Sequence, residues 1–127
     1  MDILEEITKI LADILDIEGR EITPETYLIR ELGAESIDLL ELSVAINARF
    51  QIEVNDDELF LRTMRLHLRT AAEEGKDAVG YLAEKYPALT VARVAEILAD
   101  MGGGPILRVK DIVSYIAVGT AKSKKHA

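Results

Sequence analysis

The chain has 127 residues and a formal net charge of −8; it is 49% hydrophobic but only 5% aromatic, and it contains no cysteine. These values predict one domain with an aliphatic core, and they exclude a disulfide framework or a thiolate site. Residues 1–61 hold 16 acids and 4 bases, a balance that suits basic partner surfaces and argues against nucleic-acid binding. The two histidines lack metal-ligand spacing, so no metal site is expected.

The N-terminus is acidic rather than basic, unlike the start of a signal peptide. No apolar run approaches the roughly 20 residues that span a bilayer. We therefore expect a cytoplasmic protein without stable membrane insertion.

The first element is a helix over about residues 2–16, because its apolar residues follow the 3.6-residue period. Gly19 is expected to end this helix, and Thr23–Pro24 to begin a short turn. The long connection that follows carries apolar side chains suited to lie over the core: Tyr27, Leu28, Ile29 and Leu32.

Residues 33–50 read GAESIDLLELSVAINARF and predict a second helix with two apolar stripes. One stripe lies close to a single face and suits a core: Leu39, Leu42, Ile46 and Phe50. The other stripe consists of Ile37, Leu40 and Val44 and is interrupted by Asp38 and Glu41. A helix that only covers a core does not need this second stripe, so it indicates a docking surface.

Ser36 lies just after a glycine turn, in the first turn of this helix. The simple interpretation is that Glu35 or Ser36 is an N-cap. The alternative is that the serine oxygen carries a phosphate diester, whose charge the free N–H groups and the helix dipole tolerate. Spacing alone leaves both interpretations open.

Residues 51–54 are expected to form an extended loop that packs Ile52 and Val54 inward. Asn55 then predicts an N-cap, with Glu58 reaching back from the third helical position. An apolar stripe continues from this cap and favours one long third helix: Phe60, Leu61, Met64 and Leu68.

Further helices are predicted between 62 and 105. Gly75 and Gly80 divide this segment, and a helix over Val79, Leu82 and Tyr86 ends at Pro87. Thr90 can cap another helix, whose expected buried stripe is Val91, Val94, Leu98 and Met101. The run at 102–105, three glycines and a proline, is a strong stop.

The last helix is predicted over about 109–118, ended by Gly119, with Arg108, Lys110 and Asp111 facing outward. Residues 120–127 then read as a basic, disordered tail.

Arg62, Arg65 and Arg69 fall on one face of a helix at steps of three and four residues. The simple interpretation is a solvated face. The alternative is that this stripe meets the acids of the second helix or a phosphorylated ligand.

The residues from Gly33 to Asp38, together with Glu41 and Leu42, resemble the attachment segment of acyl carrier proteins. The similarity extends through 22–26, Leu32, Phe50 and Asp56, and it resumes at 106–116, which resembles the last helix of that family. Glu35 stands where the family usually has aspartate, and Ile37 where it has leucine. Arg49 makes the end of the helix less acidic than is usual in the family.

The resemblance implies an all-α fold, an acyl-carrier-like helical bundle with two or three additional helices inserted at 62–105. Residues 1–119 would form a single carrier domain, followed by the tail at 120–127. Ser36 would bear 4′-phosphopantetheine and hold an acyl group as a thioester, for a specialised fatty-acyl, lipid or polyketide pathway.

Six residues around Ser36 would recognise partners: Glu35, Ile37, Asp38, Leu40, Glu41 and Val44. The implied partners are a phosphopantetheinyl transferase and acyl-transferring or acyl-synthesising enzymes, met by a monomeric carrier with no catalytic residue of its own. Two alternatives stay open, an aminoacyl or peptidyl carrier and a non-covalent helical adaptor that keeps the fold without the arm. An enzyme has little support, because no nucleophile–base pair or Gly-rich phosphate loop is present.

Overall fold

The computed structural model describes residues 2–125, over which the chain forms seven α-helices and one short 3-10 helix and no strand of a sheet. The predicted all-α bundle with additional inserted helices is confirmed. The elements in chain order are α1 (Ile3–Leu15), α2 (Ser36–Phe50), α3 (Asp56–Leu59), α4 (Met64–Glu73), α5 (Ala78–Lys85), α6 (Val91–Asp100), the 3-10 helix (Met101–Gly103) and α7 (Val109–Lys125).

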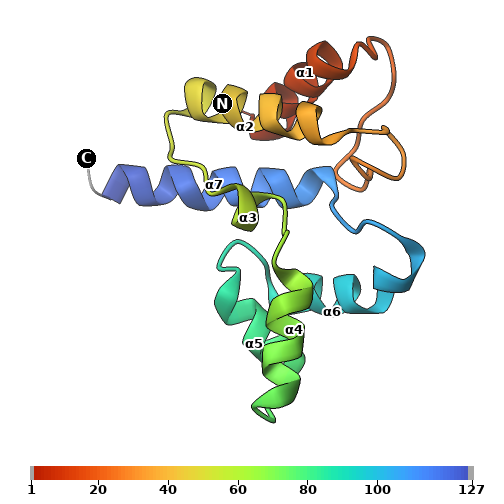
Figure 1. Ribbon diagram of the computed structural model, residues 1–127. Coiled ribbons are helices and arrows are strands. Elements are labelled where there is room, and N and C mark those ends of the chain that lie inside the picture. Colours follow the sequence, from red (N-terminus) through yellow and green to blue (C-terminus); the bar gives the residue numbers. More distant parts are fainter. Residues whose placement is uncertain (1, 126–127) are drawn as a thin grey trace.

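Helix α7 runs through the middle of the molecule and separates two groups of helices (Figure 1). Helices α1 and α2 pack on one side of α7 and on each other, and the short α3 also contacts α7. The inserted helices α4, α5 and α6 lie on the other side, where α5 packs against both of its neighbours. No helix within residues 2–125 is long and apolar enough to cross a membrane.

The core is aliphatic, as the composition predicts. It joins the bundle and the insert in one cluster, whose most completely buried aliphatic members include Ile7, Leu28, Ile46, Leu82, Val94, Ile97, Ile112 and Ile116. The predicted core face of α2 is buried at Leu39, Leu42 and Ile46. Because apolar burial contributes roughly 25 cal/mol per Å², we infer that the insert and the bundle stabilise each other.

The predicted end of the first helix is confirmed, and that of the last helix is wrong. Helix α1 ends at Leu15, before Gly19, because Asp16 takes the left-handed conformation (φ 54°) and its N–H donates to the carbonyl of Ala12. Helix α7 passes through Gly119 and continues to Lys125, so residues 120–125 are helical and not a disordered tail. Residues 126–127 lie outside the described residues.

Gly119 does not end the last helix as predicted, and its small size instead allows close packing. A Cβ added at this position would lie 3.0 Å from Cδ1 of Ile52, a buried residue of the loop between α2 and α3. The missing side chain therefore allows α7 to approach this loop closely.

The predicted long third helix is also wrong. Helix α3 ends at Leu59, and Leu61 takes a left-handed conformation (φ 55°) before α4 begins at Met64. The cap at Asn55 is confirmed, since its side chain accepts from the N–H of Glu58 at 3.1 Å. Glu58 does not complete a capping box, because the N–H of Asn55 donates to the hydroxyl of Tyr115 at 2.9 Å.

The inserted helices begin and end largely where their local signals predict. Helix α5 ends before Pro87, and the Thr90 hydroxyl accepts from the N–H of Arg93 at 3.0 Å as the cap of α6. The predicted buried stripe of α6 is wrong at Val91, which is exposed, whereas Ile97 is fully buried.

Candidate functional site

Ser36 is the first residue of α2 and its side chain is exposed. Glu35 occupies the N-cap position, and its N–H donates to the Asp38 carboxylate at 2.8 Å. The helix start is therefore capped by the neighbours of Ser36. No hydrogen bond to the Ser36 hydroxyl is found among residues 2–122.

The end of the loop before Ser36 is anchored to the core. Gly33 takes a left-handed conformation (φ 68°), and nothing lies within 4 Å of the position its Cβ would occupy. The N–H of Ala34 donates to the carbonyl of Leu28 at 3.0 Å, and both of these residues are buried. The backbone is thus fixed beneath the serine while the space above it stays open.

Three apolar side chains of α2 face solvent beside Ser36. Ile37, Leu40 and Val44 are 63%, 56% and 63% exposed, and Glu41 is exposed among them. We call these four residues the α2 docking strip. Exposed clusters of this kind mark interaction surfaces more often than isolated apolar residues do.

The opposite face of α2 is tied to the bundle. The Ser43 hydroxyl donates to the Asp56 carboxylate of α3 at 2.6 Å. Arg49 forms an ion pair with Glu6 of α1 at 3.0 Å. These two contacts hold α2 against α3 and α1.

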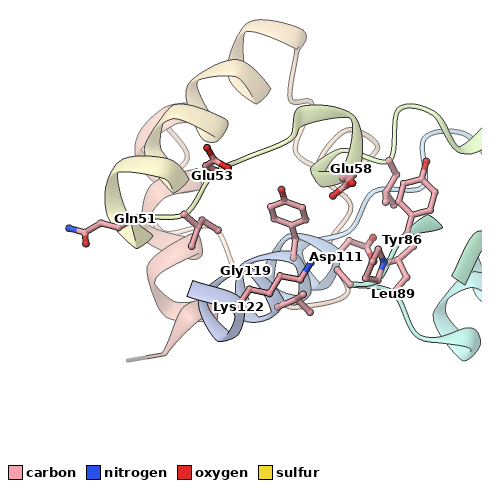
Figure 2. A pocket seen from close by; sticks show the side chains of 14 residues that line it. Gln51, Glu53, Glu58, Tyr86, Leu89, Asp111, Gly119 and Lys122 are labelled. Atoms are coloured by element: carbon pink, nitrogen blue, oxygen red, sulfur yellow. The ribbon is translucent and has the colours of Figure 1, made fainter. Parts of the chain in front are cut away.

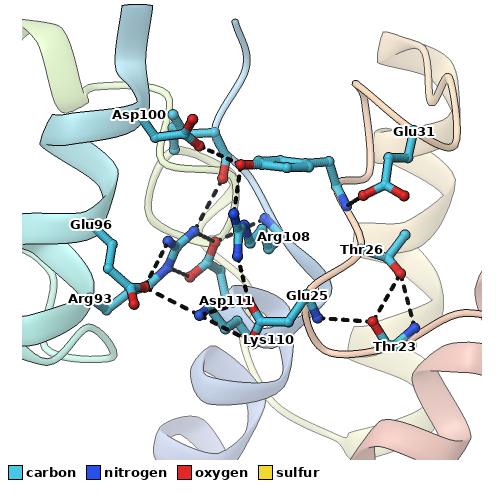
Figure 3. A network of polar contacts seen from close by, with 12 residues as sticks. Thr23, Glu25, Thr26, Glu31, Arg93, Glu96, Asp100, Arg108, Lys110 and Asp111 are labelled. Carbon is cyan, nitrogen blue, oxygen red and sulfur yellow. Dashed lines mark hydrogen bonds and ion pairs between the residues drawn. The ribbon is translucent and has the colours of Figure 1, made fainter. Parts of the chain in front are cut away.

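A polar network connects the loop before Ser36 to the inserted helices (Figure 3). The Tyr27 hydroxyl donates to Asp100, the last residue of α6, at 2.6 Å, and Arg30 forms an ion pair with the same carboxylate at 3.1 Å. Arg30 also donates to the carbonyl of Gly104 at 3.0 Å. The Tyr27 ring lies between two guanidinium groups, with Arg30 at 4.1 Å and Arg108 at 4.4 Å from its centroid.

The hydrogen bond from Tyr27, together with Arg30, lowers the pKa of the Asp100 carboxyl below its ordinary value. This carboxylate therefore stays ionised and holds the end of α6 on the loop. No local pattern in the sequence marks this contact, because the partners are 73 and 70 residues apart.

A second part of the network is buried beneath α6. Arg93 is 8% exposed and Asp111 only 3%, and the guanidinium binds both carboxylate oxygens, at 2.7 and 2.8 Å. The expectation that Asp111 faces outward is wrong, because its carboxylate both pairs with Arg93 and accepts from the N–H of Arg108 at 2.9 Å. One carboxylate thus caps α7 and anchors the insert.

At the rim of this network Lys110 binds two exposed carboxylates, Glu25 and Glu96, each at 3.2 Å. Hydrogen bonding to Lys110 is the main cause that lowers the pKa of both carboxyls. Arg108 also pairs with Glu25. These exposed pairs extend the contact but each contributes little stability.

A cavity of about 410 Å³ lies between α7, the loop before α3 and the connection from α5 to α6 (Figure 2). Its lining is largely apolar and includes Ile52, Leu61, Tyr86, Leu89 and Val118. Gln51, at the far end of α2 from Ser36, is part of this lining and lies roughly 22 Å from Ser36 along the helix at 1.5 Å per residue. Both the bundle and the connection from α5 to α6 line the cavity, and Ser36 is not among the lining residues.

The family model described as "Phosphopantetheine attachment site" matches residues 5–65. The acyl carrier protein of Nitratidesulfovibrio vulgaris (strain DSM 19637 / Miyazaki F) is 41% identical over 58 residues, which are 46% of this chain and 76% of that protein. The acyl carrier protein of Helicobacter pylori (strain J99 / ATCC 700824) is 34% identical over 58 residues, 46% of this chain and 74% of the relative.

The acyl carrier protein of Nitratidesulfovibrio vulgaris (strain DP4) is 32% identical over 85 residues, 67% of this chain and 99% of the relative. No solved structure gives a significant match. The helical fold and the matched segment define a phosphopantetheine-attachment domain. The chain belongs to the acyl carrier protein family, whose prosthetic group is 4′-phosphopantetheine.

The residues around the exposed serine fit this group. A hydroxyl free of internal hydrogen bonds can form an ester, and the N–H groups at the start of α2 favour a negative charge beside it.

Proposed function

We propose that Ser36 carries 4′-phosphopantetheine through a phosphodiester and that the chain is an acyl carrier for a specialised fatty-acyl, lipid or polyketide pathway. The observation that carries the proposal is the exposed Ser36 hydroxyl at the first position of α2, with the cap supplied by Glu35 and Asp38. When bound, the group supplies a thiol that holds an acyl chain as a thioester.

The residues of this chain position the group and do no chemistry on the acyl chain. The anchored loop at Gly33 and Ala34 holds the serine outward, and the dipole of α2 favours the negative charge of a phosphodiester by roughly 0.3–1 kcal/mol. We therefore propose that the protein is not an enzyme.

We propose that the α2 docking strip, with Glu35 and Asp38 beside it, binds a phosphopantetheinyl transferase and acyl-handling enzymes. Exposed apolar side chains next to carboxylates suit clefts that are apolar and basic. Such contacts should be small and brief, because a carrier must leave one enzyme before it meets the next.

The test is the mass of the protein after incubation with coenzyme A and a broad-specificity transferase. We expect an increase of one phosphopantetheine arm in wild type and in Ser114→Ala, and no increase in Ser36→Ala. Failure of wild type with several transferases, while its helical circular dichroism is intact, would refute the proposal and favour a non-covalent adaptor.

Glu35 allows a finer test of the same proposal, because the family usually has aspartate there. The longer Glu35 side chain displaces the carboxylate by one methylene. We expect Glu35→Asp to be modified faster than wild type by a broad-specificity transferase. Intact-protein mass after isolation from the native cell would distinguish an acyl load from an aminoacyl or peptidyl load.

We also propose that the inserted segment 62–105 and the bundle form one carrier domain. The single hydrophobic cluster that contains Ile7 of α1, Leu82 of α5 and Ile112 of α7 supports this proposal. Replacing 62–105 by a short linker should then lower the stability of the bundle. An unchanged urea midpoint would instead make the insert an independent unit.

A further inference from the structure

The N-terminal part of α4 and the turn before it carry a basic surface that has no acidic partner within the described chain. Arg62, in the turn before α4, and Arg65 and Arg69 of α4 are exposed, and Leu66 among them is 55% exposed. We call these four residues the α4 basic face. None of its arginines forms an ion pair within residues 2–122, whereas four other arginines do: Arg30, Arg49, Arg93 and Arg108.

The position of these charges does not help α4 to fold. Arg62 and Arg65 lie at the N-terminal end of the helix, whose first turn contains no acid. A positive charge at this end opposes the helix dipole and destabilises the helix by a few tenths of a kcal/mol or more. Stabilisation of α4 therefore does not account for these arginines, whereas binding to a negatively charged partner outside the chain does.

A hollow of about 360 Å³ adjoins the α4 basic face, with Arg62 and Arg65 at its edge. Its apolar lining includes two methionines, Met64 and Met101, and Ile106. Methionine side chains adapt to the shape of an inserted apolar group. The surface thus has an apolar hollow of adaptable shape beside positively charged side chains.

The complementary surface occurs on this same protein. Three of the five exposed large apolar side chains in the described residues lie in the α2 docking strip, and Leu66 lies in the α4 basic face. On α2, Asp38 and Glu41 lie about 4.5 Å apart along the helix, and on α4, Arg65 and Arg69 lie about 6 Å apart, at 1.5 Å per residue. With Glu35 and Asp38 beside it, the α2 docking strip presents three negative charges, and the α4 basic face presents three positive charges.

The two surfaces do not meet within one chain, since α2 and α4 lie on opposite sides of α7 (Figure 1). The predicted contact between the arginine stripe and the acids of α2 is therefore absent within the chain. We propose that the α4 basic face binds the acidic α2 docking strip of a second copy of this protein.

The association is weak and reversible, with a dissociation constant on the order of 0.1–1 mM, so the dilute protein is a monomer. Each copy has one surface of each kind. The copies therefore form either a closed dimer with two equivalent contacts or an open chain with head-to-tail contacts. The contact covers the α2 docking strip and so excludes other partners from it. It does not depend on the Ser36 arm, and it is tested on unmodified protein.

Sedimentation velocity at rising protein concentration tests the proposal. We expect the average mass of wild type to rise with concentration at about 0.01 M ionic strength, where the Debye length is about 30 Å, and to return to that of a monomer at about 1 M, where it is about 3 Å. A wild-type protein that stays monomeric at low salt up to millimolar concentration would overturn the proposal, whatever other acidic protein binds this face.

Two variants identify the surfaces. Arg65→Glu with Arg69→Glu changes the charge of the α4 basic face from +3 to −1, and Glu41→Lys with Val44→Lys changes the charge of the α2 docking strip, with Glu35 and Asp38 beside it, from −3 to 0. Each variant alone should stay monomeric, yet an equal mixture should form a dimer of one copy of each, since one intact surface of each kind remains. Two monomeric variants whose mixture also stays monomeric would contradict the proposed pairing.

A control matches the change in net charge. Lys76→Glu with Lys85→Glu adds as much negative charge as the α4 variant does, at exposed lysines outside the α4 basic face. This control should associate as wild type does. Loss of association in the control would mean that net charge and not the α4 basic face determines the effect, and would refute the proposal.

Discussion

The buried ion pair between Arg93 and Asp111 allows a specific prediction of how a substitution changes the free energy of unfolding. Arg93→Met keeps the apolar stem of the side chain and removes the guanidinium. It abolishes both bonds to the Asp111 carboxylate, at 2.7 and 2.8 Å, and the bond to the carbonyl of Ile106 at 3.1 Å. A carboxylate that is 3% exposed is then left without a cation.

Breaking a buried ion pair by removing one partner costs about 3–5 kcal/mol. Asp111 retains the N–H of Arg108 at 2.9 Å, so we expect a value near the lower end, about 3 kcal/mol. Removing both charges, with Arg93→Met and Asp111→Asn together, keeps an acceptor for that N–H and should cost only about 1–2 kcal/mol.

Urea unfolding followed by circular dichroism measures these values for wild type, both single variants and the double variant. Arg65→Met is the matched control, since the same substitution at an exposed arginine should stay within about 0.5 kcal/mol of wild type. A loss below about 1 kcal/mol for Arg93→Met, or a double variant as costly as the sum of the singles, would refute the reasoning.

Two further predictions concern pH and packing. The stability that the lowered pKa of Asp100 confers is complete above the ordinary aspartate pKa of about 3.9 and is lost as the pH falls through the lower folded-state value. The urea concentration at the unfolding midpoint, measured at successively lower pH, should therefore fall less steeply for Asp100→Asn than for wild type, because the variant lacks the carboxyl that Tyr27 binds. Equal slopes for the two proteins would count against this contact. Gly119→Leu should lower the thermal midpoint by an amount that corresponds to about 1–3 kcal/mol, since even a Cβ would lie 3.0 Å from Ile52. Gly102→Leu, with nothing within 4 Å of its Cβ position, is the control and should change the midpoint much less.

Local signals in the sequence predicted the elements near the attachment site well. The two apolar stripes of α2 separate into a buried face at Leu42 and Ile46 and an exposed strip at Ile37 and Val44. Such periodicity is a property of one helix and needs no knowledge of its neighbours. The Thr90 cap was predictable for the same reason.

The sequence could not predict features that depend on contacts between distant segments. Asp111 looks like a solvated residue in the first turn of a helix, and only the fold brings Arg93 to it. The left-handed conformation of Leu61 breaks the third helix without a glycine or proline to mark the position. Gly119 has the residue type of a helix end, but its small size instead permits the approach of Ile52.

The network around Tyr27 links the inserted helices to the loop that leads to Ser36. This loop is held by the segment just before α7, because the N–H of Leu28 donates to the carbonyl of Leu107 at 3.1 Å. The same loop is held by the end of the insert, through Asp100. The conformation of the loop is thus coupled to the docking of the insert, while the serine itself stays exposed.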